Sequence, residues 1–390
     1  MRSLASPIGP DERRARAEHA RKLMADNSCA AIVITSGSSL PYFSALRWWT
    51  SERLFAMVMP AKREPFFVCP AFEEGRVREQ LATGPFGRDA DIRIWQEDDD
   101  PYARVAQGFH DRGISSGTIG IEEKTPFVFS SGIAAAAPAA HFVSATPITA
   151  GCRMIKSAQE ITLMRLASKV TLTAYAAAFT ALHDGMTQHD FASLIAAAHE
   201  RLGFRGAAEV QVGEYSALPH GSIQPQAIRS GAVILIDGGC EVEGYNSDLS
   251  RTFVLGRATD EMKHVFATVQ QAQQAALAAA KPGVACGSVD AAARSVIDRA
   301  GFGPGYKCFT HRAGHGIGLD GHEWPYLVRG NRTPLRVNMV FSDEPGIYQT
   351  GKYGVRLEDD MYITEQGAEL FTLPSPSLEE PFANAPSVRE

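Results

Sequence analysis

Residues 311–325, HRAGHGIGLDGHEWP, contain three histidines and four glycines. A helix is not expected here, because each glycine costs about 1 kcal/mol relative to alanine. Imidazoles serve as metal ligands and as proton carriers near neutral pH, so His311, His315 and His322 are candidates for metal or acid–base chemistry. His322 and Glu323 begin like H-E-x-x-H, but no second histidine follows, which excludes the one-ion metalloprotease helix.

Four carboxylates stand in or beside segments of strand-like composition, namely AVILIDGG (Asp237), YNSDLSRTFVLG (Asp248), MVFSDEPGIY (Glu344) and YGVRLEDDMYIT (Glu358). A buried, ionised carboxylate costs several kcal/mol unless it is paired or coordinated, so the repeated pattern indicates a nearby cation. Oxygen ligands with one imidazole favour a catalytic site for Mn, Co, Zn or Fe over a structural zinc. Five side chains exceed the needs of one open ion and suit two ions bridged by carboxylates and a water.

Each of these residues also has a plainer interpretation when it is taken alone. Asp237 before Gly-Gly could form a turn, Glu358 could lie on a solvated edge, and His315 could hydrogen-bond backbone. Asp248 could cap a turn, and Glu344 could simply end a strand. The metal interpretation rests on their joint occurrence.

The elements that would position these residues repeat along the second part of the chain. GMTQHDFASLIAAAHERLGF at 185–204 aligns without gaps to GVACGSVDAAARSVIDRAGF at 283–302, although chance similarity of two amphipathic helices is an alternative. Ser157 and Glu160 form a capping-box pattern, which predicts a long helix from there to about Leu182. Each half then supplies histidine followed by two carboxylates, and a pseudo-two-fold duplication would bring the two sets together.

The first part of the chain has a different pattern. Residues 1–150 alternate helical composition, as in DERRARAEHARKLMAD, with short apolar runs such as CAAIVIT, FAMVMPA and PFFVCP. We therefore expect an α/β domain over 1–150, a catalytic domain over 151–390, and a proline-rich tail from about 374. A chain of 390 residues is long enough for two domains.

Composition excludes several classes of function. A net charge of −6, and no basic stripe, argue against nucleic acid or an anionic membrane as partner. No run of 18 apolar residues and no apolar signal segment at the N-terminus are present, which leads us to expect a soluble, cytoplasmic protein. Six scattered cysteines without a C-x-x-C pair predict reduced thiols.

Taken in order, HRAGHGIGLDGHEWP, DGG followed by SDLSRTF, EPGIY and GVRLED resemble the pita-bread metallopeptidases: methionine aminopeptidase, aminopeptidase P and Xaa-Pro dipeptidase (prolidase). The resemblance spans residues 157 to about 370 and is closest to the prolidase branch. It implies an α+β pita-bread catalytic domain with an internal pseudo-two-fold repeat, preceded by a creatinase-like N-terminal α/β domain.

The resemblance also implies roles for individual residues. Two divalent ions, with manganese favoured over Co, Zn or Fe, would be held by Asp237, Asp248, His315, Glu344 and Glu358. His220 and His322 match the family's two active-site histidines that do not bind metal, and the role of His311 stays open. Glu344 is expected to take the proton of a hydroxide-forming water and His322 to stabilise the oxyanion. His220 is expected to orient the substrate or to help protonate the leaving group.

A dipeptidase must also hold the free carboxylate of its substrate, for which arginine is the natural partner. Arg356, Arg329 and Arg332 are the candidates, each with a structural ion pair as the alternative. In the resembling family an N-domain loop of the partner subunit can reach the active site. LRWWTSER at 46–53, with Trp48, could therefore shape a pocket in a homodimer, or could simply pack.

The function expected from sequence is thus hydrolysis of small peptides with proline at the second position. Xaa-Pro dipeptidase is the leading interpretation and Xaa-Pro aminopeptidase the first alternative. A metal-free creatinase-like hydrolase and a non-enzymatic peptide-binding module are further alternatives, and both are disfavoured by the complete set of five ligands.

Overall fold

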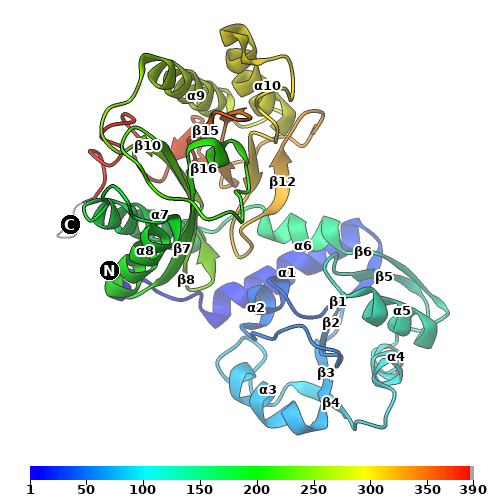
Figure 1. Cartoon of the computed structure of the whole chain (residues 1–390). Helices are drawn as coiled ribbons and strands as arrows, with labels where there is room; N and C mark the ends of the chain where they lie inside the picture. The colour runs from blue at the N-terminus through cyan, green and yellow to red at the C-terminus, as the bar shows by residue number, and fades with distance from the viewer. Residues whose placement is uncertain (387–390) are drawn as a thin grey trace. The chain divides into compact units, whose positions relative to one another are not determined.

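The computed structural model describes residues 1–386 and divides the chain into two compact units (Figure 1). One unit is Ile8–Arg153. The other joins Met1–Pro7 to the chain from Met154 onward.

Ile8–Arg153 is built around one six-stranded sheet with the strand order β4-β3-β2-β1-β5-β6. Its strands are β1 (Cys29–Ile34), β2 (Ala56–Pro60), β3 (Phe66–Pro70), β4 (Asp91–Trp95), β5 (Gly117–Ile121) and β6 (Ala140–Ser144). Its helices are α1 (Pro10–Asp26), α2 (Ser39–Ser44), α3 (Glu74–Leu81), α4 (Pro101–Asp111), α5 (Phe127–Ala136) and α6 (Thr146–Arg153). β2 and β3 are buried along their whole length, as expected for continuous apolar runs in a sheet covered on both faces.

The second unit contains two helix pairs. They are α7 (Ala158–Phe179) with α8 (Gln188–Leu202), and α9 (Asp260–Ala279) with α10 (Cys286–Ile297). The predicted capping box at Ser157 and Glu160 is present, with both reciprocal hydrogen bonds, and the helix that it starts ends at Phe179, three residues before the predicted Leu182. The aligned sequence copies correspond to α8 and α10 with their preceding turns, so each helix pair repeats the same order of elements.

Antiparallel strands follow each helix pair. The first set has the order β10-β8-β7, with β9 beside β8, and comprises β7 (Arg205–Val212), β8 (Val233–Val242), β9 (Tyr245–Asn246) and β10 (Leu249–Val254). The second set has the order β12-β11-β13-β16-β17, with a separate β14-β15 hairpin. It comprises β11 (Gly314–Gly316), β12 (Glu323–Leu327), β13 (Val340–Asp343), β14 (Gly346–Gln349), β15 (Tyr353–Arg356), β16 (Asp359–Ile363) and β17 (Ala368–Leu370).

A buried ion pair joins the two sets of strands. The Arg251 guanidinium on β10 is fully buried and lies 2.7 Å from Asp359 on β16, and it also donates to the backbone carbonyl of Glu358 at 2.8 Å. Ser250 and Glu358 form an isolated β-bridge at the same place. This contact fixes the ends of β10 and β16 against each other.

The C-terminal segment packs against the strands of the second unit. Leu378 is buried, and its carbonyl accepts from the Val254 backbone N–H at 2.9 Å, so the predicted proline-rich tail packs on this unit as far as it is described. Residues 387–390 of that tail lie outside the described residues.

All six cysteines are free thiols, which confirms the prediction of reduced cysteines. Within residues 1–386, no helix is long and apolar enough to cross a membrane.

Candidate active site

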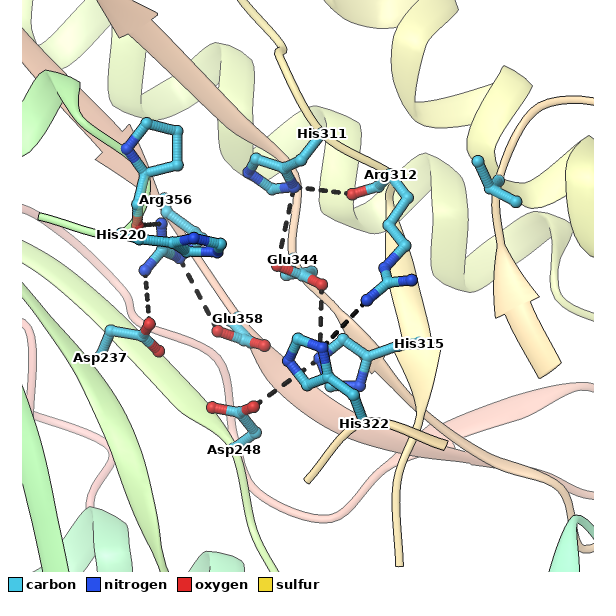
Figure 2. Close-up of a pocket in the computed structure, with 12 residues that line it drawn as sticks. His220, Asp237, Asp248, His311, Arg312, His315, His322, Glu344, Arg356 and Glu358 are labelled. Carbon is cyan, nitrogen blue, oxygen red and sulfur yellow. Dashed lines mark hydrogen bonds and ion pairs between the residues drawn. The ribbon is translucent and has the colours of Figure 1, made fainter. Parts of the chain in front are cut away.

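The five predicted metal ligands converge in one pocket of the second unit (Figure 2). Asp237 lies on β8 opposite Ser250 of β10, and Asp248 precedes β10. The other three residues belong to the second set of strands. His315 is the middle residue of β11, Glu344 lies between β13 and β14, and Glu358 lies between β15 and β16. Ligand atoms of these residues fall within 4.8 Å of one another in overlapping groups of three, including Asp237–Asp248–Glu358 and His315–Glu344–Glu358.

Close backbone approach explains the Gly-Gly that follows Asp237. A Cβ on Gly239 would lie 1.8 Å from the backbone oxygen of Ser247, which no larger residue could avoid. The glycine therefore lets the Asp248 segment lie against β8. This contact brings the two aspartates of the first half to one place.

The imidazole of His315 is oriented as a metal ligand. Its Nδ1 donates to the Gly316 carbonyl at 3.1 Å, which leaves the Nε2 lone pair free. Nε2 lies 3.5 Å from Glu344 and 3.7 Å from Asp248. Burial and the neighbouring His322 lower the pKa of His315 to about 3, so the ring is neutral, as coordination requires.

The carboxylates of the pocket outnumber the one guanidinium that pairs with them directly, that of Arg356. Burial, and then repulsion from Asp237, raise the pKa of Asp248 well above its usual value. Burial, and then repulsion from Asp248, likewise raise the pKa of Glu358 well above its usual value. Burial raises the pKa of Glu344 to about 7. Divalent cations would relieve this cost, so the donor set fits a metal centre of oxygen ligands and one imidazole.

The Arg356 guanidinium pairs with this cluster of carboxylates. Arg356 lies 2.7 Å from an Asp237 oxygen and donates to the Ser250 hydroxyl at 2.9 Å. Its Nη1 atom donates to the Pro219 carbonyl at 3.0 Å and to the Tyr348 hydroxyl at 2.9 Å. The Arg356 side chain is almost fully buried, and its hydrogen bonds link β8, β10, the Pro219 loop and Tyr348 beneath the pocket.

The two predicted non-ligand histidines, His220 and His322, line the pocket, and so does His311, whose role was left open. His220 is exposed on the loop that follows Pro219. His322 stacks on His315 with ring centroids 3.7 Å apart. His311 lies deeper, with Nε2 2.7 Å from the Tyr348 hydroxyl and Nδ1 2.8 Å from the Arg312 carbonyl, so both of its ring nitrogens are engaged.

The other predicted substrate residues lie elsewhere. Arg329 and Arg332 are exposed and do not line the pocket, and the Arg329 guanidinium lies over the Tyr306 ring at 5.0 Å. Trp48 belongs to the unit Ile8–Arg153. There it stacks on Phe55, with centroids 4.7 Å apart, and on Trp49.

Sequence reasoning missed three residues of the pocket wall, Pro219, Arg312 and Val328, and the supporting Tyr348. Arg312 stands inside the histidine-rich stretch, directly after His311. Its Nη2 lies 2.9 Å from Nδ1 of His322. Strand alternation could not have identified Arg312, because this residue precedes β11 (Gly314–Gly316) and an odd spacing from His315 would place the two side chains on opposite faces.

The fold and the site together define a metallopeptidase. The chain belongs to metallopeptidase family M24, whose match covers residues 162–365, and residues 16–155 match the creatinase/prolidase N-terminal domain. The family implies divalent metal ions. These matches confirm the resemblance to pita-bread metallopeptidases, the α/β plus α+β fold class and the prediction of an enzyme.

Similar proteins are dipeptidases by name. The probable dipeptidase PepE of Mycobacterium tuberculosis (strain ATCC 25618 / H37Rv) is 36% identical over 349 residues, 88% of this chain and 90% of its own length. The Xaa-Pro dipeptidase of Lactobacillus delbrueckii subsp. lactis is 31% identical over 363 residues, 90% of this chain and 95% of its own length. The crystal structure of dipeptidase PepE from Mycobacterium ulcerans has a TM-score of 0.89 and 33% identity, over 96% of this chain and 99% of that one.

Proposed function

We propose that the protein hydrolyses Xaa-Pro dipeptides with two divalent ions held by Asp237, Asp248, His315, Glu344 and Glu358. The observation that carries the proposal is the convergence of these five donors in one pocket. The pocket volume of about 480 Å³ falls in the range of small-molecule sites. The dipeptidase names of the similar proteins support the same substrate class.

The bound ions would supply Lewis-acid activation of a water and of the peptide carbonyl. In this proposal Glu344 accepts the proton of the attacking water and passes it towards the leaving prolyl nitrogen, which carries no hydrogen of its own. Its position in the ligand group, 3.5 Å from His315 Nε2, supports that role. General-base catalysis of this kind typically contributes a factor of about 10² to 10⁴.

The hydrogen bond between Arg312 and His322 supports a role for His322 as a donor. A guanidinium can only donate, so Nδ1 of His322 accepts from Arg312. The proton of a neutral His322 ring is then on Nε2, where it can be donated to an oxyanion. His220, exposed at the pocket wall, would orient the substrate.

A substrate panel tests the proposal. Ala-Pro, Ala-Pro-Ala and Ala-Ala would be incubated with the protein in the presence of Mn²⁺, Co²⁺ or Zn²⁺. Hydrolysis of Ala-Pro alone is the expected result. Cleavage of Ala-Pro-Ala would replace the dipeptidase by an Xaa-Pro aminopeptidase, and failure to cut any of the three would point to a creatinase-like hydrolase or a peptide-binding module.

Manganese as the native ion, a homodimer and a cytoplasmic location remain predictions that accompany this proposal. The exposed Trp49 beside Trp48 supports an interface on the LRWWTSER loop. Sedimentation of the wild type and of a Trp49→Ser variant would test the dimer, because loss of an interface aromatic should shift the equilibrium towards monomer.

A further inference from the structure

The proposed dipeptidase activity requires a cation for the free carboxylate of the substrate, and two arginines line the pocket. Arg356 is poorly suited, because four hydrogen bonds already hold its guanidinium against Asp237, Ser250, Pro219 and Tyr348. Only one of its five N–H groups is left without a partner. Turning the Arg356 guanidinium towards a substrate would break its 2.7 Å ion pair with Asp237.

Arg312 is in the opposite situation. Its side chain is half-buried at the pocket wall, and Figure 2 shows it extending towards the ring of His322. Its one hydrogen bond goes to Nδ1 of His322. Among residues 1–386, no carboxylate lies within ion-pair distance of the Arg312 guanidinium, so this guanidinium has no direct ion pair.

A second contact fixes the direction of Arg312. The guanidinium lies over the Tyr326 ring, 4.2 Å from its centre, and Trp324 packs on the same ring with centroids 4.7 Å apart. Held by a ring face and by His322, the Arg312 fork loses less side-chain freedom on binding a ligand. It can offer its remaining N–H groups to a planar carboxylate.

An apolar side chain shares the pocket with this cation. Val328 directly follows β12 and lines the pocket together with Arg312. Its methyl groups suit a prolyl ring, while the Arg312 guanidinium, which has no direct ion pair, suits the carboxylate that this ring carries.

We infer that Arg312 binds the free α-carboxylate of the substrate while Val328 contacts the C-terminal side chain, which makes Arg312 a specificity-determining residue for dipeptides. This inference rests on the proposed function. It also assigns the carboxylate to a residue other than Arg356, Arg329 and Arg332. A charge-assisted hydrogen bond of this kind is about twice as strong as a neutral one.

The test compares Ala-Pro with Ala-Pro amide, which has the same scissile bond and no carboxylate charge. For Arg312→Met, kcat/KM for Ala-Pro should fall about ten- to hundredfold, mainly through KM, while the amide loses at most a few-fold. Arg312→Lys should restore part of the preference for the acid, because it keeps the charge and loses the fork. Arg329→Met is the matched control, since Arg329 lies outside the pocket, and should leave both substrates unchanged.

The outcomes separate this inference from the proposed function. If the wild type cuts Ala-Pro and Arg312→Met loses acid and amide equally, the residue only supports His322, and the inference is overturned while the function stands. If Arg312→Met does not fold, Arg312→Lys gives the comparison, and an unchanged ratio of kcat/KM for acid and amide in that variant would overturn the inference. If the wild type cuts no Xaa-Pro dipeptide with any ion, the function fails and the inference fails with it.

Discussion

The loop that carries His220 is tied to the protein by buried glutamines, and breaking that tie should reduce catalysis. Gln211 on β7 is 8% exposed, and its Oε1 accepts from the Ser222 backbone N–H and from Gln226 Nε2, each at 2.9 Å. Gln226 in turn donates its backbone N–H to Gln188 at 2.8 Å. Both contacts of Gln211 hold the segment that follows His220.

The Gln211→Leu substitution removes the acceptor but keeps the approximate volume of the side chain. It leaves the Ser222 N–H and the Gln226 amide without their partner, at a cost of about 1–3 kcal/mol for each unsatisfied donor. We expect the loop to relieve this cost by leaving its position. If about 1–3 kcal/mol of positioning is lost, kcat/KM should fall roughly 5- to 150-fold, since about 1.4 kcal/mol corresponds to tenfold.

Steady-state kinetics on Ala-Pro, normalised to bound metal, would measure this effect. Gln224→Leu is the matched control, because Gln224 lies in the same loop with an exposed side chain. Limited proteolysis gives an independent readout: Ile223 at the loop tip is 98% exposed, and cleavage there should accelerate in Gln211→Leu. A change of less than twofold in both kcat/KM and cleavage rate would refute the reasoning.

Three further predictions follow from other contacts. Arg251→Met leaves the buried Asp359 carboxylate without its cation and should lower the free energy of unfolding by about 3–5 kcal/mol in urea titrations; a loss below about 1 kcal/mol would contradict this. Burial lowers the pKa of His199 below 6.5, so the unfolded chain binds that proton more readily and stability should fall as pH drops below 6.5; His199→Leu should flatten this dependence, and an unchanged pH profile would count against it. Glu344→Gln should reduce turnover per bound metal at least about 100-fold, and full turnover with metal retained would exclude Glu344 as the base.

The convergence of the candidate metal ligands was predictable, because their carboxylates stand in segments where a charge is unexpected. Asp237 at the end of AVILI and Glu358 after GVRL both place carboxylates in segments that must be buried. The helix that starts at Ser157 was predictable for a local reason as well, since the capping box needs only residues three apart. Local patterns of this kind survive folding because they do not depend on distant partners.

The candidate substrate-binding residues were harder to predict, because the partners of each arginine lie far away in sequence. Arg356 stands two residues before a ligand, yet its donors are taken by Asp237 and by the Pro219 carbonyl, more than a hundred residues away. Arg312 is left without an acidic partner for a reason equally invisible in the sequence, since it packs on Tyr326 from a neighbouring strand. A sequence shows which charges exist, but only the fold shows which of them are already neutralised.

The most direct test of the account is a metal titration of the stripped protein with Ala-Pro as substrate. Ions would be removed by chelation, Mn²⁺, Co²⁺ or Zn²⁺ added back, and bound metal and hydrolysis measured on the same samples. The five converging donors predict that activity is lost on stripping and returns as two ions bind per chain. Hydrolysis that persists without metal, or that reaches its maximum with no ion bound at the His315 group, would contradict the account.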